Sequence, residues 1–104
     1  MKITVSEKGA KLLISLSGEL DHHEARELLR QIESRLEVSM PRDCVLDLSQ
    51  LKFMDSSGIA VILRTYKRMN ELGGRLWVEN VPPQPLRVLD ASGIDRLVKI
   101  SAQT

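Results

Sequence analysis

The sequence predicts an α/β domain in which five strands and three helices follow one another in the order β-β-α-β-α-β-α-β. Three observations predict it. Short runs in which apolar residues alternate give way to stretches with helical spacing, and then to short β-prone runs again. Glycines and prolines separate these runs, and no internal repeat or linker interrupts them. The chain has 104 residues, 42% of them apolar, which predicts a single domain over residues 1–104. Strands that alternate with helices predict a mixed sheet with helices packed on it.

The first two strands are predicted to form a hairpin. Residues 1–7 alternate, with Ile3 and Val5 as the apolar members, and Lys8-Gly9 is typical of a turn. Residues 12–16 alternate in the same way, and we expect this second strand to end at Gly18.

A change of period marks the first helix. Asp21 is a favourable N-cap, and Glu24 stands three residues later, where a capping box places its acid. Pro41 marks the end of the helical pattern. The apolar residues share one face of this helix, at Ala25, Leu28, Leu29, Ile32 and Leu36.

The rest of the chain repeats the strand–helix alternation. Residues 44–48 predict a central strand covered on both faces, because the run is short, apolar and β-prone. Helical spacing follows from Ile59 to Leu72, and Gly73-Gly74 ends it. The remaining elements are predicted as a strand at residues 76–78, a short helix at 85–91 closed by Gly93, and a last strand at 97–100.

Composition excludes several classes of function. The formal charge is +1 with both signs interspersed, and only three residues are aromatic, so neither a phosphate-backbone surface nor a stacking platform for nucleic acid is expected. The lone Cys44 cannot form an intramolecular disulfide, which favours a reducing compartment. The N-terminus lacks the apolar region of a signal peptide, and the longest apolar run, residues 59–63, is too short to cross a bilayer. We therefore expect a soluble cytoplasmic protein that contacts no membrane.

The stretch "MDSSG" at residues 54–58 is the main candidate site. It joins a predicted central strand to a helix, and function in open α/β sheets collects at the carboxyl ends of strands. A helix N-terminus also favours anions, including a phosphate ester. Gly58 would keep bulk away from the seryl oxygens and let a partner approach. Alternatively, Asp55 or Ser56 caps the helix and does nothing more, because both residue types lead at N-caps.

Other chemistries find less support in the sequence. His22 and His23 are adjacent, so on a helix their side chains diverge by about 100° and cannot easily share one metal ion. Asp47 and Asp55, with Lys52, could suggest an aspartyl-phosphate site, but Asp47 lies inside an apolar strand. A serine hydrolase would need a nucleophile elbow, which "MDSSG" is not. We expect no catalytic residue, no metal, no cofactor and no enzymatic activity.

Taken together, three segments resemble the STAS domain, and more narrowly the sporulation-type anti-sigma factor antagonists. They are "GELDHHEA" at Gly18–Ala25, "VLDLSQLKFMDSSGIAVILRTYKRMNELGG" at Val45–Gly74 and "PLRVLDASGI" at Pro85–Ile94. The resemblance extends over nearly all of the chain. It implies a STAS fold, a mixed sheet with helices mainly on one face. Family members commonly end with a further helix after the last strand, which is very short or missing here.

The resemblance also implies a switch. The unmodified antagonist binds an anti-sigma factor that is itself a serine kinase of the GHKL type, and this frees the sigma factor. The kinase phosphorylates the first serine of the D-S-S-G motif, here Ser56, and a phosphatase of the PP2C type removes the phosphate. The expected partner-binding residues are Asp21, Asp55, Ser56, Ser57 and Gly58. Because Asp21 comes directly after the second predicted strand, we expect it to lie near Asp55. An alternative is a STAS module that binds a nucleotide or another anion without this switch.

Overall fold

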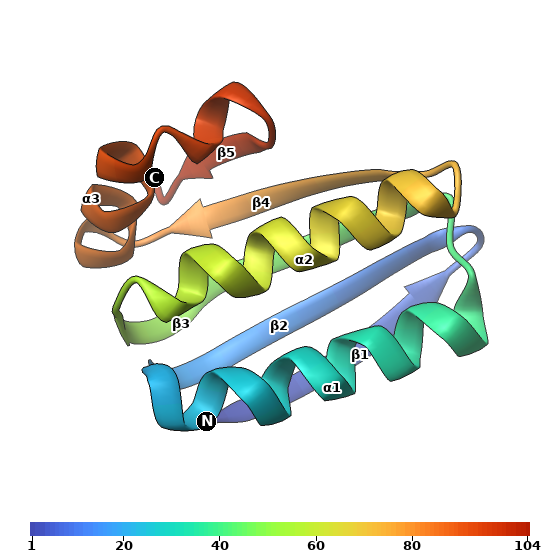
Figure 1. Ribbon diagram of the computed structural model, residues 1–104, viewed down its shortest axis with the longest axis horizontal. Helices are drawn as coiled ribbons and strands as arrows, with labels where there is room; N and C mark the ends of the chain where they lie inside the picture. The colour runs from blue at the N-terminus through green and yellow to red at the C-terminus, as the bar shows by residue number, and fades with distance from the viewer.

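A computed structural model describes residues 1–104. Eight main elements follow one another in the predicted order, and Figure 1 shows their arrangement. The strands are β1 (Lys2–Lys8), β2 (Lys11–Leu20), β3 (Asp43–Met54), β4 (Arg75–Val81) and β5 (Lys99–Ala102). The helices are α1 (His22–Ser39), α2 (Ser57–Glu71) and α3 (Pro83–Ser92), with a short 3₁₀ turn, η1, at Ile94–Arg96.

The five strands form one mixed sheet in the order β1-β2-β3-β4-β5. β1 and β2 pair antiparallel through a two-residue turn, and the other neighbours pair parallel. The helices α1 and α2 lie side by side across the same face of the sheet (Figure 1). The predicted α/β class, the element order and the one-sided helix layer are therefore confirmed.

The core lies between the sheet and these two helices. Alternate residues of β2, β3 and β4 point toward the helices, as a period of two requires. Cys44 belongs to this layer, and burial raises the pKa of its thiol to about 12, which leaves it protonated and unreactive at neutral pH. The principal buried residues are Leu12, Ile14, Leu16, Leu28, Ile32, Leu46, Leu48, Val61, Met69 and Val78.

Three strand predictions were too short. The strand predicted at residues 76–78 spans Arg75–Val81 as β4. β2 continues through Gly18 to Leu20, because Gly18 takes a φ of 104° at a register irregularity and the strand resumes after it. β3 continues through the polar "SQLKF" segment to Met54, since it stays paired with β2 across two register shifts. β5 also starts two residues later than predicted, because η1 occupies the preceding residues.

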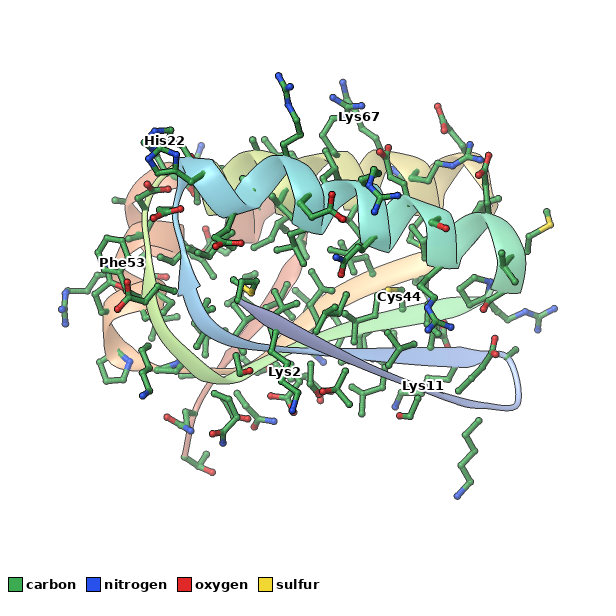
Figure 2. The ribbon with its side chains drawn as sticks, turned by 90° about the horizontal axis from the view of Figure 1, so that it is seen from below. Lys2, Lys11, His22, Cys44, Phe53 and Lys67 are labelled. Carbon is green, nitrogen blue, oxygen red and sulfur yellow. The ribbon has the colours of Figure 1, made fainter.

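The prediction that the central strand is covered on both faces was wrong. Helices cover one face only, and Figure 2 shows Lys2 and Lys11 extending from the sheet on the side away from the helix layer. Val45 on this second face is nevertheless fully buried, although it lies outside the main core cluster. No helix of the chain is both long and apolar enough to cross a bilayer.

Candidate functional site

The candidate site lies where β2 and β3 end side by side. Leu20 and Met54 are paired in register, and the Asp55 amide donates to the Leu20 carbonyl over 3.1 Å. Asp21 and Asp55 therefore follow directly on neighbouring parallel strands. The expectation that Asp21 lies near Asp55 is confirmed. Figure 2 shows the same end of the molecule at His22 and Phe53.

Asp55, and not Ser56, caps the helix that begins here. The Asp55 carboxylate accepts from the Ser57 amide at 2.8 Å, and the Asp55 carbonyl accepts from the Gly58 amide at 3.0 Å. Ser56 stands at the N-cap position with helical φ and ψ of −64° and −15°, but its side chain makes no capping hydrogen bond. Because the neighbouring acid satisfies the helix end, the exposed Ser56 hydroxyl stays free for another partner.

Gly58 is required for close packing inside the protein and not for clearance at its surface. It is buried, and a Cβ at this position would lie 2.4 Å from the Met54 sulfur and 3.2 Å from a Leu20 methyl carbon. From the sequence, Gly58 was expected to give clearance around the serines. Because Gly58 has no side chain, the first turn of α2 can pack closely against the last residue of β3. This close packing sets the position of Ser56 and Ser57 relative to the sheet.

A residue that sequence reasoning missed holds the end of β3. The Gln84 side chain, from the first turn of α3, accepts from the Met54 amide at 2.9 Å and donates to the Met54 carbonyl at 2.9 Å. This pair of hydrogen bonds satisfies the last residue of β3, beyond the segment that pairs with β4. A glutamine between two prolines gave no local signal for such a contact, because its partner lies 30 residues away.

Asp21 caps α1 as predicted. Its carboxylate accepts from the His23 amide at 3.0 Å and from the Glu24 amide at 3.1 Å. The hydrogen bond from Glu24, then that from His23 and the nearby histidines, holds the pKa of Asp21 below its ordinary value. The structure shows only this half of the expected capping box, with no return hydrogen bond to the Glu24 carboxylate. Oδ1 of Asp21 is thus already engaged with two backbone donors.

Two hollows flank the serines. The first, of about 590 Å³, lies between α2 and α3 and brings together Ser56, Ile59, Gln84, Arg87, Val88, Ala91 and Ser92. The second, of about 530 Å³, lies between α1 and α2, with Ser57 at one end and Arg26, Arg30 and Arg64 among its lining residues. Ser56 and Ser57 therefore open toward different grooves, so a partner that contacts both serines must span the N-terminus of α2.

The residues considered from sequence for a metal site or an aspartyl-phosphate site do not gather around Ser56. The rings of His22 and His23 lie 4.0 Å apart, but no group of three or more metal-ligating side chains forms. The Asp47 carboxylate is used within its own strand, where it accepts from the Ser49 amide at 2.9 Å. At the start of α2 the site presents the exposed Ser56 side chain, whose hydroxyl makes no capping hydrogen bond.

Comparison with known proteins agrees with this geometry. The family model described as "STAS domain" matches residues 2–104. An anti-sigma F factor antagonist of Paenibacillus polymyxa is 38% identical over 96% of this chain and 86% of its own length. An anti-sigma-B factor antagonist of Bacillus subtilis strain 168 is 28% identical over the whole of this chain and 94% of its own.

Solved structures show the same fold. The anti-sigma factor antagonist SpoIIAA in its unphosphorylated form superposes with a TM-score of 0.82 at 24% identity, over 95% of this chain and 87% of the other. The Bacillus cell fate determinant SpoIIAA in its phosphorylated form gives a TM-score of 0.73 at 24% identity, over 95% and 90%. With a family match over nearly its full length and a relative at 38% identity, this chain belongs to the STAS domain family.

Proposed function

We propose that this protein is an anti-sigma factor antagonist that phosphorylation of Ser56 switches off. The name of the 38% identical relative supports the class of function. The single observation that carries the switch is the free hydroxyl of Ser56, which is exposed at a helix start while Asp55 takes over the capping. The unmodified protein binds an anti-sigma factor of the GHKL serine kinase type. A PP2C-type phosphatase restores the binding form.

The proposed partner surface is centred on the N-terminus of α2. Its polar part consists of Asp21, Asp55, Ser56 and Ser57. The buried Gly58 contributes indirectly, because it allows the start of α2 to pack closely on the end of β3. The apolar residues of the groove between α2 and α3, chiefly Ile59 and Val88, extend this surface beyond the serines. A small polar centre beside apolar side chains is the composition that a specific protein interface requires.

The switch follows from charge. Phosphorylation adds about −1.5 to −2 charges to Ser56, next to the carboxylate of Asp55 and near that of Asp21. A partner surface matched to a neutral hydroxyl then faces a dianion that must be desolvated, and like charges across an interface cost several kcal/mol. A loss of about 3–4 kcal/mol lowers affinity by about 10²- to 10³-fold, which is sufficient for an on/off response.

An intact-mass and phosphosite assay tests the proposal. The protein is incubated with Mg²⁺-ATP, alone and with the GHKL-type kinase encoded in the same genome. We expect one phosphoryl group on Ser56, added only when the kinase is present, and none on Ser56→Ala. Ser56→Ala should keep its affinity for the kinase, while Ser56→Asp should bind more weakly.

Three results would contradict parts of the proposal. Modification of Ser57 instead of Ser56 would contradict the assignment from the capping geometry. Ser56→Asp binding as tightly as wild type would remove the electrostatic mechanism. Binding of ATP or GTP by the isolated protein, with no modification in either tube, would favour a STAS module that binds nucleotides or anions.

A further inference from the structure

The hollow between α2 and α3 contains four polar side chains, and two of them have no partner. The Gln84 amide group is engaged with the backbone of Met54, and the Ser92 hydroxyl donates to a backbone carbonyl of α3 at 2.7 Å. The Ser56 hydroxyl makes no capping hydrogen bond, and none of the ion pairs of the chain includes Arg87. Arg87 is exposed and is the only charged residue that lines this hollow. A free hydroxyl and a free cation therefore share one hollow.

The position of Arg87 follows from the contact that holds α3 against the end of β3. Gln84, in the first turn of α3, binds both backbone groups of Met54, which precedes Ser56 by two residues. Residues three apart share one face of a helix, so Arg87 lies one turn further along the face on which Gln84 lies. On α2, Ile59 follows Ser56 by the same spacing. The start of α2 lies beside α3 (Figure 1), and these two helix faces line the hollow.

We propose that Arg87 binds the phosphate of phosphorylated Ser56 across this hollow, so that the chain carries its own phosphate-recognition residue. The inference rests on the proposed function, because it takes Ser56 as the modified residue. A guanidinium group suits this ligand, since its planar fork donates two parallel hydrogen bonds to phosphate oxygens. Such charge-assisted hydrogen bonds are about twice as strong as neutral ones. Phosphorylation supplies the acceptor oxygens and the negative charge that the unmodified hydroxyl lacks.

Binding of the phosphate also changes what a partner meets. Arg87 lies beside Val88 in the groove that extends the proposed partner surface, so its unpaired guanidinium group belongs to that surface. A guanidinium group that is engaged with the phosphate is withdrawn from other acceptors. Modification of Ser56 therefore alters the surface in two ways, because it adds a negative group and removes a free cation.

The neighbouring serine supplies a matched control. Ser57 opens into the groove between α1 and α2, which Arg87 does not line. Arg26 lines that groove, and like Arg87 it is exposed and takes part in none of the ion pairs. The two arginines thus lie on opposite sides of the start of α2, and only Arg87 shares a hollow with Ser56. Replacement of Arg26 removes the same charge from this end of the molecule without removing the proposed receptor.

Phosphoserine incorporated at position 56 during translation tests the inference without any kinase. Phosphorus NMR then follows the second ionisation of the phosphate, whose ordinary pKa is about 6. A bound cation favours the dianion, so the phosphate pKa should be about 0.5–1 unit higher in Arg87→Gln than in the wild type and unchanged in Arg26→Gln. Arg87→Lys keeps the charge but loses the planar fork and should give an intermediate value. The other charged and titratable groups at this end of the neighbouring elements are the same in all four proteins, namely Asp21, His22, His23, Asp55 and Asp90.

A second measurement on the wild-type sequence needs no substitution at Arg87. The Nε–H resonance of Arg87 should move as the phosphate ionises, and it should stay in place over the same pH range when Ser56 is unmodified. Equal phosphate pKa values in Arg87→Gln and Arg26→Gln, or an Arg87 resonance that does not respond to the phosphate, would overturn the inference. Failure of the proposed function would be seen separately, as a kinase that does not modify Ser56 while these NMR results stand.

Discussion

The assignment of the helix cap to Asp55 predicts how two neighbouring side chains differ in their effect on stability. Asp55→Ala removes the acceptor for the Ser57 amide at 2.8 Å, whereas Ser56→Ala removes a hydroxyl that makes no capping hydrogen bond. The two positions are adjacent in sequence and both residue types are common caps. Any difference between the variants therefore reports the actual hydrogen bonding.

The magnitudes follow from the contacts. Loss of a capping side chain costs about 1 kcal/mol, within a range of about 0.5–2. Loss of a negative charge beside a helix N-terminus adds about 0.3–1 kcal/mol. We therefore expect Asp55→Ala to lower the free energy of unfolding by about 1–2.5 kcal/mol and the melting temperature by about 5–15 °C. Asp55→Asn retains an acceptor and should lose only the smaller charge contribution. Ser56→Ala should stay within about 0.5 kcal/mol of wild type.

Urea unfolding followed by the emission of Trp77 measures all three variants on the same scale, because the chain has no other tryptophan. Ser56→Ala is also the variant that cannot be phosphorylated, so its near-native stability is needed for the functional assay to be interpretable. If Ser56→Ala is destabilised by about 1 kcal/mol or more while Asp55→Ala is neutral, the serine is the cap and the reasoning about its free hydroxyl fails.

Three further predictions concern the residues around the site. Gln84→Ala should lower stability by about 1–3 kcal/mol, because two backbone groups of Met54 lose their partner, and hydrogen exchange should accelerate at the Met54 amide. Gly58→Ala should destabilise by about 1–3 kcal/mol in urea unfolding, since its Cβ would lie 2.4 Å from the buried sulfur of Met54; a stability equal to wild type would show that the turn can relax. Asp21 has a folded-state pKa depressed below the ordinary 3.8, so its contribution is present above that pH and lost as pH falls through the folded value. The stability difference between wild type and Asp21→Asn should accordingly shrink in acid, and a difference independent of pH would contradict the capping role.

The spacing of apolar residues predicted the helices and strands well, because the signals for each element lie within its own segment of the sequence. The helix from Asp21 to Pro41 is an example: its cap, apolar stripe and terminator all lie within the segment itself. The strand ends were harder, because they depend on pairing. Gly18 ends an alternating run in the sequence, but in the sheet it forms an irregularity through which β2 continues, and a Cβ there would lie 3.3 Å from the backbone of Met1.

The site was predicted in position but not in internal detail. Asp21 was expected near Asp55 from its position after the second strand, and the structure brings the two together because both follow strands that are parallel neighbours. It could not decide between Asp55 and Ser56 as the cap, since both offer an oxygen at a permitted distance. Nor could it find Gln84, whose contact with Met54 depends on how α3 folds back over the end of β3.

These details favour a switch that acts through charge at a rigid surface. The two hydrogen bonds between Gln84 and Met54 hold the end of β3, and Asp55 caps the start of α2. The absence of a side chain at Gly58 allows these two segments to pack closely together. A phosphate on Ser56 would also sit at a helix N-terminus, which favours an anion by about 0.3–1 kcal/mol and offsets part of the repulsion from Asp55. The intramolecular cost is therefore reduced, whereas the cost of about 3–4 kcal/mol at the partner surface has no such compensation. Because most of the free-energy cost arises in the interface, phosphorylation should alter partner affinity far more than it alters the fold or its stability.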